Sequence, residues 1–394
     1  MSRTRSRVAL AAVVYVVLLA QVLLYPGIDT LVAALGAGTA LDGSMWFLTA
    51  EFAAFVAFAI PWGAASDAAG RRVPFVAAGA LLGGLGYASL ALLPTFGEPS
   101  FGVVLALRVL QGGATVGAFS LAMTMLMDLE GSHGRNMGAA GIAIGLGTAT
   151  GAPLGGVLYE LGALVPLAVA SGLFVAVAAV VPFVVGEGIE VRERTRSPFD
   201  GLRRTPELGL PYVFGFVDRL TAGFFSLVGT LYFRTIFGLS PAATGLTLAL
   251  FFAPFALLQY PFGVVSDRIG RTLPIVAGST LYGGAVILVG AVPTVRAAQA
   301  SMVLVGVLGA LMVPATMALV TDLADPSQRG VAMAGFNIFG SLGFLAGILV
   351  GGFAADAYGY PTAFLLVGCL ELAVVAATIP AFLRLDVDTL SEGV

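Results

Sequence analysis

The sequence predicts an all-α membrane protein of twelve transmembrane helices, arranged as two pseudo-symmetric six-helix bundles with both termini in the cytoplasm. Three observations predict this fold class: the composition, the number of apolar runs and an internal repeat. Of the 394 residues, 58% are hydrophobic and only 10% are charged, and the mean hydropathy is +0.99. Soluble domains are roughly a quarter charged and about half apolar. The composition therefore excludes a water-soluble fold.

The apolar runs form two groups of six, and each run reaches the roughly 20 residues that a spanning helix needs. The first six predicted helices are 8–28, 44–65, 73–93, 101–127, 137–161 and 165–185. The last six are 208–233, 242–266, 273–292, 298–323, 330–355 and 362–383. Three arginines precede the first run, as in a secretory signal. Because eleven more spans follow it with short gaps, we interpret it as the first spanning helix.

The positions of the arginines predict the orientation. Short cytoplasmic loops attract basic residues, and a cytoplasmic N-terminus puts 15 of the 19 arginines inside. Arg108 and Arg219 fall within helices, and only Arg234 and Arg296 lie near outer ends. An odd number of missed helices would have scrambled this asymmetry. We therefore predict a multi-pass protein of the cell membrane. The cytoplasmic arginines are Arg3, Arg5, Arg7, Arg71, Arg72, Arg135, Arg192, Arg194, Arg196, Arg203, Arg204, Arg268, Arg271, Arg329 and Arg384.

An internal repeat predicts that the two bundles are copies of one unit. A shift of 200 residues aligns eleven identical residues between 61–84 and 261–284. Further along, Asp128 recurs as Asp322. The predicted domains are therefore an N-terminal bundle, 1–186, a cytoplasmic linker, 187–207, and a C-terminal bundle, 208–394. A glycine series also recurs: Gly147, Gly151 and Gly155 return as Gly343, Gly347 and Gly351.

The loop after the second helix of each half has the pattern Gly, three residues, Asp, two residues, Gly-Arg. Its residues are Gly63, Asp67, Gly70 and Arg71 in the first half and Gly263, Asp267, Gly270 and Arg271 in the second. With the twelve helices, the linker and the duplication, this pattern resembles the signature loop of the major facilitator superfamily, and the resemblance covers essentially the whole chain. It implies secondary transport by two halves that rock about a central site.

The resemblance also implies a cytoplasmic gate. Asp67 would meet the helix that starts near Gly330, and Arg71 would pair with Asp128. The mirrored set is Asp267, Arg271 and Asp322. Ala68 stands where the family usually has a basic residue, so we expect the first copy to latch less tightly.

The fourth helix carries Arg108, two residues, then Gln111-Gly112, which resembles a family element associated with proton coupling. An arginine at this depth costs several kcal/mol unless it faces protein or a wet cavity, so we expect it to have a partner. The alternative is a structural arginine that holds the backbone of the first helix.

The fifth helix contains Gly147, Gly151, Pro153 and Gly155. Glycines four residues apart permit close helix packing, and Pro153 should kink the helix. In the family, Gly-Pro-two residues-Gly-Gly here is typical of proton-coupled exporters. This chain departs from the pattern, because Ala152 occupies the proline place. Generic close packing needs the same glycines.

Carboxylates within the predicted helices are candidates for carrying a proton. We predict Asp218 and Glu51 for this role, with a static ion pair as the alternative. Asp218 precedes Arg219, and adjacent helical residues point about 100 degrees apart, so we expect each to find a separate partner. Glu371 is expected to be peripheral and Asp29 a charge at the rim.

We predict a monomeric transporter that exports a small amphipathic or hydrophobic solute in exchange for protons, with sodium as the alternative ion. A sugar or metabolite importer or uniporter of the same fold, or a non-transporting sensor, is the alternative function. Neither an enzyme, a cofactor nor a metal is expected, because His133 and Cys369 are the only residues of their kinds. The formal charge of −3 indicates no nucleic-acid partner, and the helices contact membrane lipid. The predicted cavity residues are Gln21, Tyr25, Gln111 and Arg219, beside Arg108 and Asp218.

Overall fold

The computed structural model describes residues 3–129, 133–186, 202–325 and 328–391, and within these ranges all regular structure is helical. Twelve segments of the described chain are long and apolar enough to cross a membrane, which confirms the predicted all-α fold with twelve spans. They are Thr4–Val22, Ala40–Ala68, Val73–Phe96, Phe101–Asp128, Gly138–Leu161, Val165–Val184, Pro206–Thr235, Pro241–Ile269, Thr272–Ala291, Val295–Leu323, Arg329–Tyr358 and Tyr360–Phe382.

The chain divides into two compact units. The first contains Met1–Glu193 and Phe233–Ala249, and the second contains Arg194–Tyr232 and Leu250–Val394. The end of the seventh span and the start of the eighth thus belong with the first unit, whereas the repeat assigns them to the C-terminal half. Residues 187–201 of the predicted linker lie outside the described residues, as do the side chains of His133 and Arg135.

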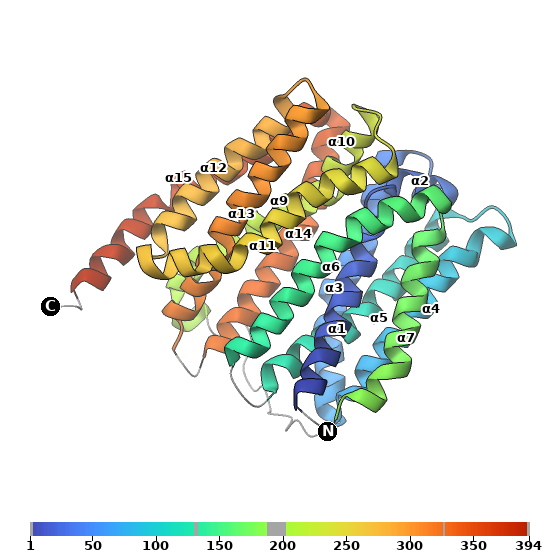
Figure 1. The fold of residues 1–394 in the computed structure, drawn as a ribbon, viewed down its shortest axis with the longest axis horizontal. Helices are drawn as coiled ribbons and strands as arrows, with labels where there is room; N and C mark the ends of the chain where they lie inside the picture. The colour runs from blue at the N-terminus through green and yellow to red at the C-terminus, as the bar shows by residue number, and fades with distance from the viewer. Residues whose placement is uncertain (1–2, 130–132, 187–201, 326–327, 392–394) are drawn as a thin grey trace. The chain divides into compact units, whose positions relative to one another are not determined.

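The first unit contains seven helices before the linker: α1 (Arg3–Val22), α2 (Ile28–Ala34), α3 (Ala40–Ala68), α4 (Val73–Leu92), α5 (Phe101–Asp128), α6 (His133–Leu161) and α7 (Val165–Val184). The predicted first helix is interrupted after Val22, because Pro26 cannot donate a helical hydrogen bond. In this unit α1 lies along α6, as Figure 1 shows, and α5 packs against both α3 and α4.

The second unit begins with α9 (Gly209–Phe224), a π-helical turn (Phe225–Gly229) and the start of α10 (Thr230–Thr235). Most of α11 (Pro241–Ile269) follows. It continues with α12 (Thr272–Ala291), α13 (Val295–Leu323), α14 (Arg329–Tyr358) and α15 (Tyr360–Ser391). Here α9 packs against α14, and α12 packs against both α13 and α15.

Glycines let two helix pairs meet backbone to backbone. A Cβ atom added to Gly155 of α6 would lie 2.2 Å from the carbonyl oxygen of Leu23, which follows α1. A Cβ atom on Gly347 of α14 would lie 1.9 Å from the carbonyl oxygen of Leu220 in α9. The repeated glycine series is therefore a repeated packing contact, in which a missing side chain allows the close approach.

Candidate functional site

The first unit contains a buried ion pair between α3 and α5. Arg108 donates one hydrogen bond to Oε2 of Glu51 and another to Oε1 of Gln111. The Nε2 atom of Gln111 lies 3.4 Å from Oε1 of Glu51, and all three side chains are completely buried. A Cβ atom on Gly112 would lie 2.5 Å from the carbonyl oxygen of Glu51, so this glycine lets α5 approach α3. The partner that Arg108 needs at this depth is Glu51.

Polar and aromatic side chains surround this pair. The guanidinium carbon of Arg108 lies 4.3 Å from the centre of the Phe47 ring and 5.6 Å from that of Tyr87, within the range of cation–π attraction. Tyr25 is buried and interacts electrostatically with both charges of the pair. Gln21 is also buried, and among the described residues its Nε2 atom has no hydrogen-bond partner.

The second unit holds two carboxylates in spanning helices. The Nε atom of Arg219 lies 3.7 Å from Oδ2 of Asp218, so the prediction that these neighbours find separate partners is wrong. The long arginine side chain reaches back to the adjacent carboxylate while 45% of it stays exposed. Glu371 of α15 is 1% exposed and interacts electrostatically with Asp218. The second unit thus buries a carboxylate that was expected to be peripheral.

In the first signature loop, a single buried arginine joins two carboxylates. Nη1 of Arg72 lies 2.5 Å from Oδ2 of Asp128, and Nη2 lies 3.2 Å from Oδ1 of Asp67. Only 4% of the Arg72 side chain is exposed. The structure therefore gives the contact with Asp128 to Arg72, the neighbour of the expected Arg71.

In the second signature loop, the expected residues form the contact. Nε of Arg271 lies 2.9 Å from Oδ2 of Asp322, and Nη1 lies 2.6 Å from Oδ1 of Asp267. Burial lowers the pKa of Arg271, but its hydrogen bonds to Asp322 and Asp267 raise that pKa by more than burial lowers it, so the net shift is upward. Gly70 and Gly270 have φ values of +62° and +87°, a left-handed backbone that favours glycine.

An ion pair within the first unit joins residues 205 positions apart. Nε of Arg234, in α10, lies 3.0 Å from Oδ1 of Asp29 in α2, and Nη2 lies 2.9 Å from Oδ2. Arg234 also donates to the carbonyl oxygen of Leu239 at 2.6 Å and to the hydroxyl of Thr30 at 3.1 Å. This pair was not predicted from the sequence. Its only signal was that both charges fall near the same predicted membrane face.

The start of α11 is fastened to the first unit by glycines as well. A Cβ atom on Gly245 would lie 2.3 Å from the carbonyl oxygen of Ala152, and one on Gly156 would lie 2.6 Å from that of Pro241. Ala152 and Gly156 belong to α6, beside Pro153. The segment Phe233–Ala249 is therefore held by α2 through charge and by α6 through close packing.

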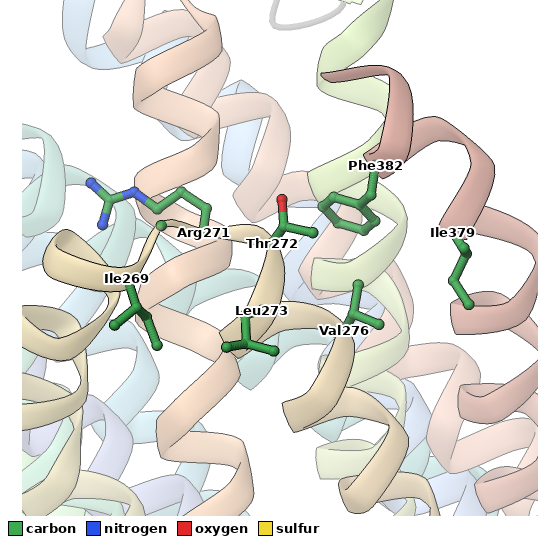
Figure 2. Close-up of a pocket in the computed structure, with 8 residues that line it drawn as sticks. Ile269, Arg271, Thr272, Leu273, Val276, Ile379 and Phe382 are labelled. Atoms are coloured by element: carbon green, nitrogen blue, oxygen red, sulfur yellow. The ribbon is translucent and has the colours of Figure 1, made fainter. Parts of the chain in front are cut away.

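A pocket of about 360 Å³ lies beside the second signature loop. Figure 2 shows its lining, in which Phe382 and Ile379 of α15 face Val276 of α12, while the guanidinium of Arg271 points away from them. A second pocket, of about 380 Å³, is formed by apolar side chains of α3, α4 and α5. Neither lining includes a predicted cavity residue.

Comparisons with known sequences all find membrane transporters. The family model described as Major Facilitator Superfamily matches the chain twice, over residues 10–214 and 211–393. An uncharacterized MFS-type transporter of Methanocaldococcus jannaschii is 30% identical over 175 residues, 43% of each chain. The inner membrane transport protein YajR of Escherichia coli is 28% identical over 150 residues, 38% of this chain and 33% of YajR. The matched regions thus span less than half the length of these relatives.

A solved structure extends the comparison to almost the whole chain. A bacterial homolog of the human lysosomal transporter Spinster, in an inward-facing and occupied conformation, superposes with a TM-score of 0.81. The superposition covers 95% of both chains at 13% sequence identity. At this identity the likeness shows the fold alone.

Proposed function

This chain belongs to the major facilitator superfamily, and we propose that it exports a small amphipathic or hydrophobic solute in exchange for protons. The superfamily consists of secondary transporters and not of enzymes. The chain is accordingly a multi-pass membrane protein that transports a small molecule. The proposal adds the direction, the coupling ion and the kind of solute, and it locates the protein in the cell membrane with cytoplasmic termini.

The observation that carries the proposal is the completely buried pair of Glu51 and Arg108. Two charges removed from water are expensive to keep, and well-packed apolar residues often serve stability equally well. A proton that binds Glu51 neutralises its carboxylate, so the ion pair is lost and the charge of Arg108 is uncompensated. The protein can relieve that charge only by changing the surroundings of Arg108. Proton binding at Glu51 therefore has the energy to drive a conformational change.

The residues around the pair supply the proposed substrate contacts. Tyr25 and Gln111 offer a phenol and an amide group that interact with the charges, and Tyr87 and Phe47 offer aromatic surface. Gln21 of α1 offers a second buried amide. An amphipathic molecule needs both kinds of contact. Asp218 and Arg219 of the second unit remain candidates for the same solute. The two signature-loop networks, around Arg72 and Arg271, are the proposed gate.

Transport by the purified protein in proteoliposomes tests the proposal. A pH-sensitive dye inside the vesicles reports proton movement while a panel of amphipathic, sugar and nucleoside compounds is offered with and without a pH gradient. We expect an amphipathic compound to move against its gradient while protons move the other way, and the same compound to exchange passively without the gradient. Compound uptake together with protons, or sugar transport without proton movement, would establish the importer or uniporter instead.

A matched pair of variants assigns the coupling. Glu51→Gln removes the proposed proton acceptor, whereas Glu98→Gln makes the same chemical change at an exposed loop position. We expect Glu51→Gln to retain passive exchange and lose uphill transport, and Glu98→Gln to retain both. Uphill transport that survives Glu51→Gln but is lost in Asp218→Asn would move the coupling site to α9.

A further inference from the structure

We propose that Glu371 of α15 holds a proton in the buried part of the second unit, where it interacts electrostatically with Asp218 of α9, and that this proton site is separate from the Glu51–Arg108 pair. The ligand of this site is a proton. The site depends only on packing and charge within the second unit of the folded chain.

Four helices bring polar atoms to one level of the second unit. Phe214, Ile275, Ala315 and Val375 belong to one buried apolar cluster and come from α9, α12, α13 and α15. Helical residues three or four positions apart share a face. Each of the four helices carries a polar or sulfur-containing residue one turn along the same face: Asp218, Ser279, Met312 and Glu371. The two carboxylates therefore lie in a small polar layer beside an apolar core.

The side chain of Glu371 is enclosed in this layer. It is 1% exposed, and among the described residues its Oε2 atom is buried without a hydrogen-bond partner. Ser279 interacts with the carboxyl group, while its hydroxyl also lies 3.1 Å from the sulfur of Met312. An ionised carboxylate offers acceptors only, whereas the protonated group has an O–H donor. Burying an oxygen without a hydrogen-bond partner costs less free energy in a neutral carboxyl group than in a charged carboxylate.

The charges in the layer do not balance without a proton. The groups that face Glu371 are Asp218 of α9, and Ser279 and Tyr282 of α12. Among the described residues, the cation in contact with one of these two carboxylates is Arg219, which lies 3.7 Å from Asp218 and has 45% of its side chain exposed. One arginine against two carboxylates leaves one negative charge in an apolar bundle, which is unfavourable. One bound proton makes the group neutral. In the first unit, by contrast, Glu51 and Arg108 balance one to one.

Packing alone does not require a carboxyl group at this position. α12 and α15 lie side by side (Figure 1). A Cβ atom on Gly283 of α12 would lie 3.1 Å from the Cβ of Glu371 and 2.9 Å from the carbonyl oxygen of Gly368. In the first unit, the repeat places Gly83 of α4 at the equivalent position, and a Cβ atom on Gly83 would lie 3.6 Å from Cδ1 of Phe174 in α7. Where one copy buries a phenylalanine, the other buries an acid.

The consequence for transport is a second protonatable site. This consequence rests on the proposed function, whereas the site itself does not. Proton release from Glu371 would add a second negative charge to that of Asp218, and the two carboxylates would then attract Arg219 more strongly. Arg219 could then not serve the solute. The state of Glu371 thereby sets whether Arg219 is available.

The pH dependence of stability tests the site without any transport assay. If the folded chain holds a proton that the unfolded chain releases, stability falls as pH rises above the ordinary range of glutamate. Thermal unfolding of the full chain in detergent is followed at several pH values for the wild type, Glu371→Gln and the exposed control Glu98→Gln. We expect the unfolding equilibrium of the wild type and Glu98→Gln to shift by up to about tenfold per pH unit relative to Glu371→Gln.

Each other outcome decides against a part of the proposal. Equal pH dependence in the wild type and Glu371→Gln overturns the proton site. So does a Glu371→Gln chain that fails to fold at every pH, because the proposal holds this group neutral. Stabilisation of the wild type by sodium, compared with choline at constant pH, and lost in Glu371→Gln, makes the site a sodium site instead. Asp218→Asn should let Glu371 release its proton at lower pH, and an unchanged profile overturns the electrostatic influence of Asp218 on this site. None of these readouts depends on the solute or on transport.

Discussion

Arg108 of α5 and Glu51 of α3 face each other with neither side chain exposed to solvent. The pair closes on itself through Gln111, which accepts from Arg108 and lies within hydrogen-bond distance of Glu51. The Nε atom of Arg108 has no hydrogen-bond partner among the described residues. Arg108 therefore has one counter-charge, one amide acceptor and two neighbouring aromatic rings, and removal of Glu51 leaves its buried charge without an ionic partner.

This relationship predicts strongly non-additive substitutions. Glu51→Leu alone and Arg108→Met alone should each lower the free energy of unfolding by about 3–5 kcal/mol, because each leaves one buried charge unpaired. The double variant should lose less than either single variant, since no charge then remains. Chemical unfolding of the four proteins completes the cycle. Additive losses would mean that water or another group already compensates the charges.

The two signature loops should differ in how much their arginines contribute. Arg72→Gln leaves Asp128 and Asp67 without a buried cation, and we expect a loss of about 1–3 kcal/mol of stability together with slower turnover. Arg271→Gln removes contacts to carboxylates that are half exposed or more, and we expect about 0–1 kcal/mol. Arg268→Gln, in the same loop and exposed, is the control. A larger effect at Arg271 would show that burial is not what distinguishes the two loops.

Asp29 and Arg234 should behave as a pair. Asp29→Asn or Arg234→Gln should each cost about 1.5–3 kcal/mol, because the hydrogen bonds involve charged groups and both side chains are mostly buried. Exchanging the two charges in one protein should restore part of this loss. Full restoration is not expected, since an aspartate at position 234 cannot donate to the carbonyl oxygen of Leu239. Thermal unfolding measures all four proteins, and a swap as damaging as the sum of the single changes would contradict the pairing.

The glycine contact between α6 and α1 gives a steric prediction. Gly155→Ala places a methyl group 2.2 Å from a backbone oxygen that cannot turn aside, and we expect a loss of about 1–3 kcal/mol. Gly141→Ala, on the same helix, adds a methyl group with nothing within 4 Å. That variant should be neutral or more stable by up to about 1 kcal/mol, because alanine favours the helix. Equal effects at the two positions would show that α6 is free to move away from α1.

The sequence was sufficient for the number of helices and for the motif that joins Arg271, Asp267 and Asp322. These features depend on apolar length and on residues close together in a repeat, so local patterns contain them. The role of Arg72 was not predictable, because Arg71 and Arg72 both follow the glycine. Which of the two points at Asp128 depends on the exact phase of the following helix.

Other contacts depend on the tertiary fold alone. Asp29 and Arg234 are 205 positions apart, and a short apolar pattern holds no information on such a pair. The burial of Glu371 depends on the rotation of α15 about its own axis, which Gly283 of α12 fixes. A uniformly apolar helix does not reveal which of its sides faces protein and which faces lipid.

The glycine contacts between α6 and α1, and between α14 and α9, make each of these two helix pairs a rigid element. Where two helices approach through glycines at successive turns, few side-chain atoms lie between the backbones to be compressed or displaced. A displacement of one end of such a helix pair is transmitted to its other end with little bending of the helices. A tilt of such a helix pair therefore moves both of its ends together, in opposite directions about the point of rotation.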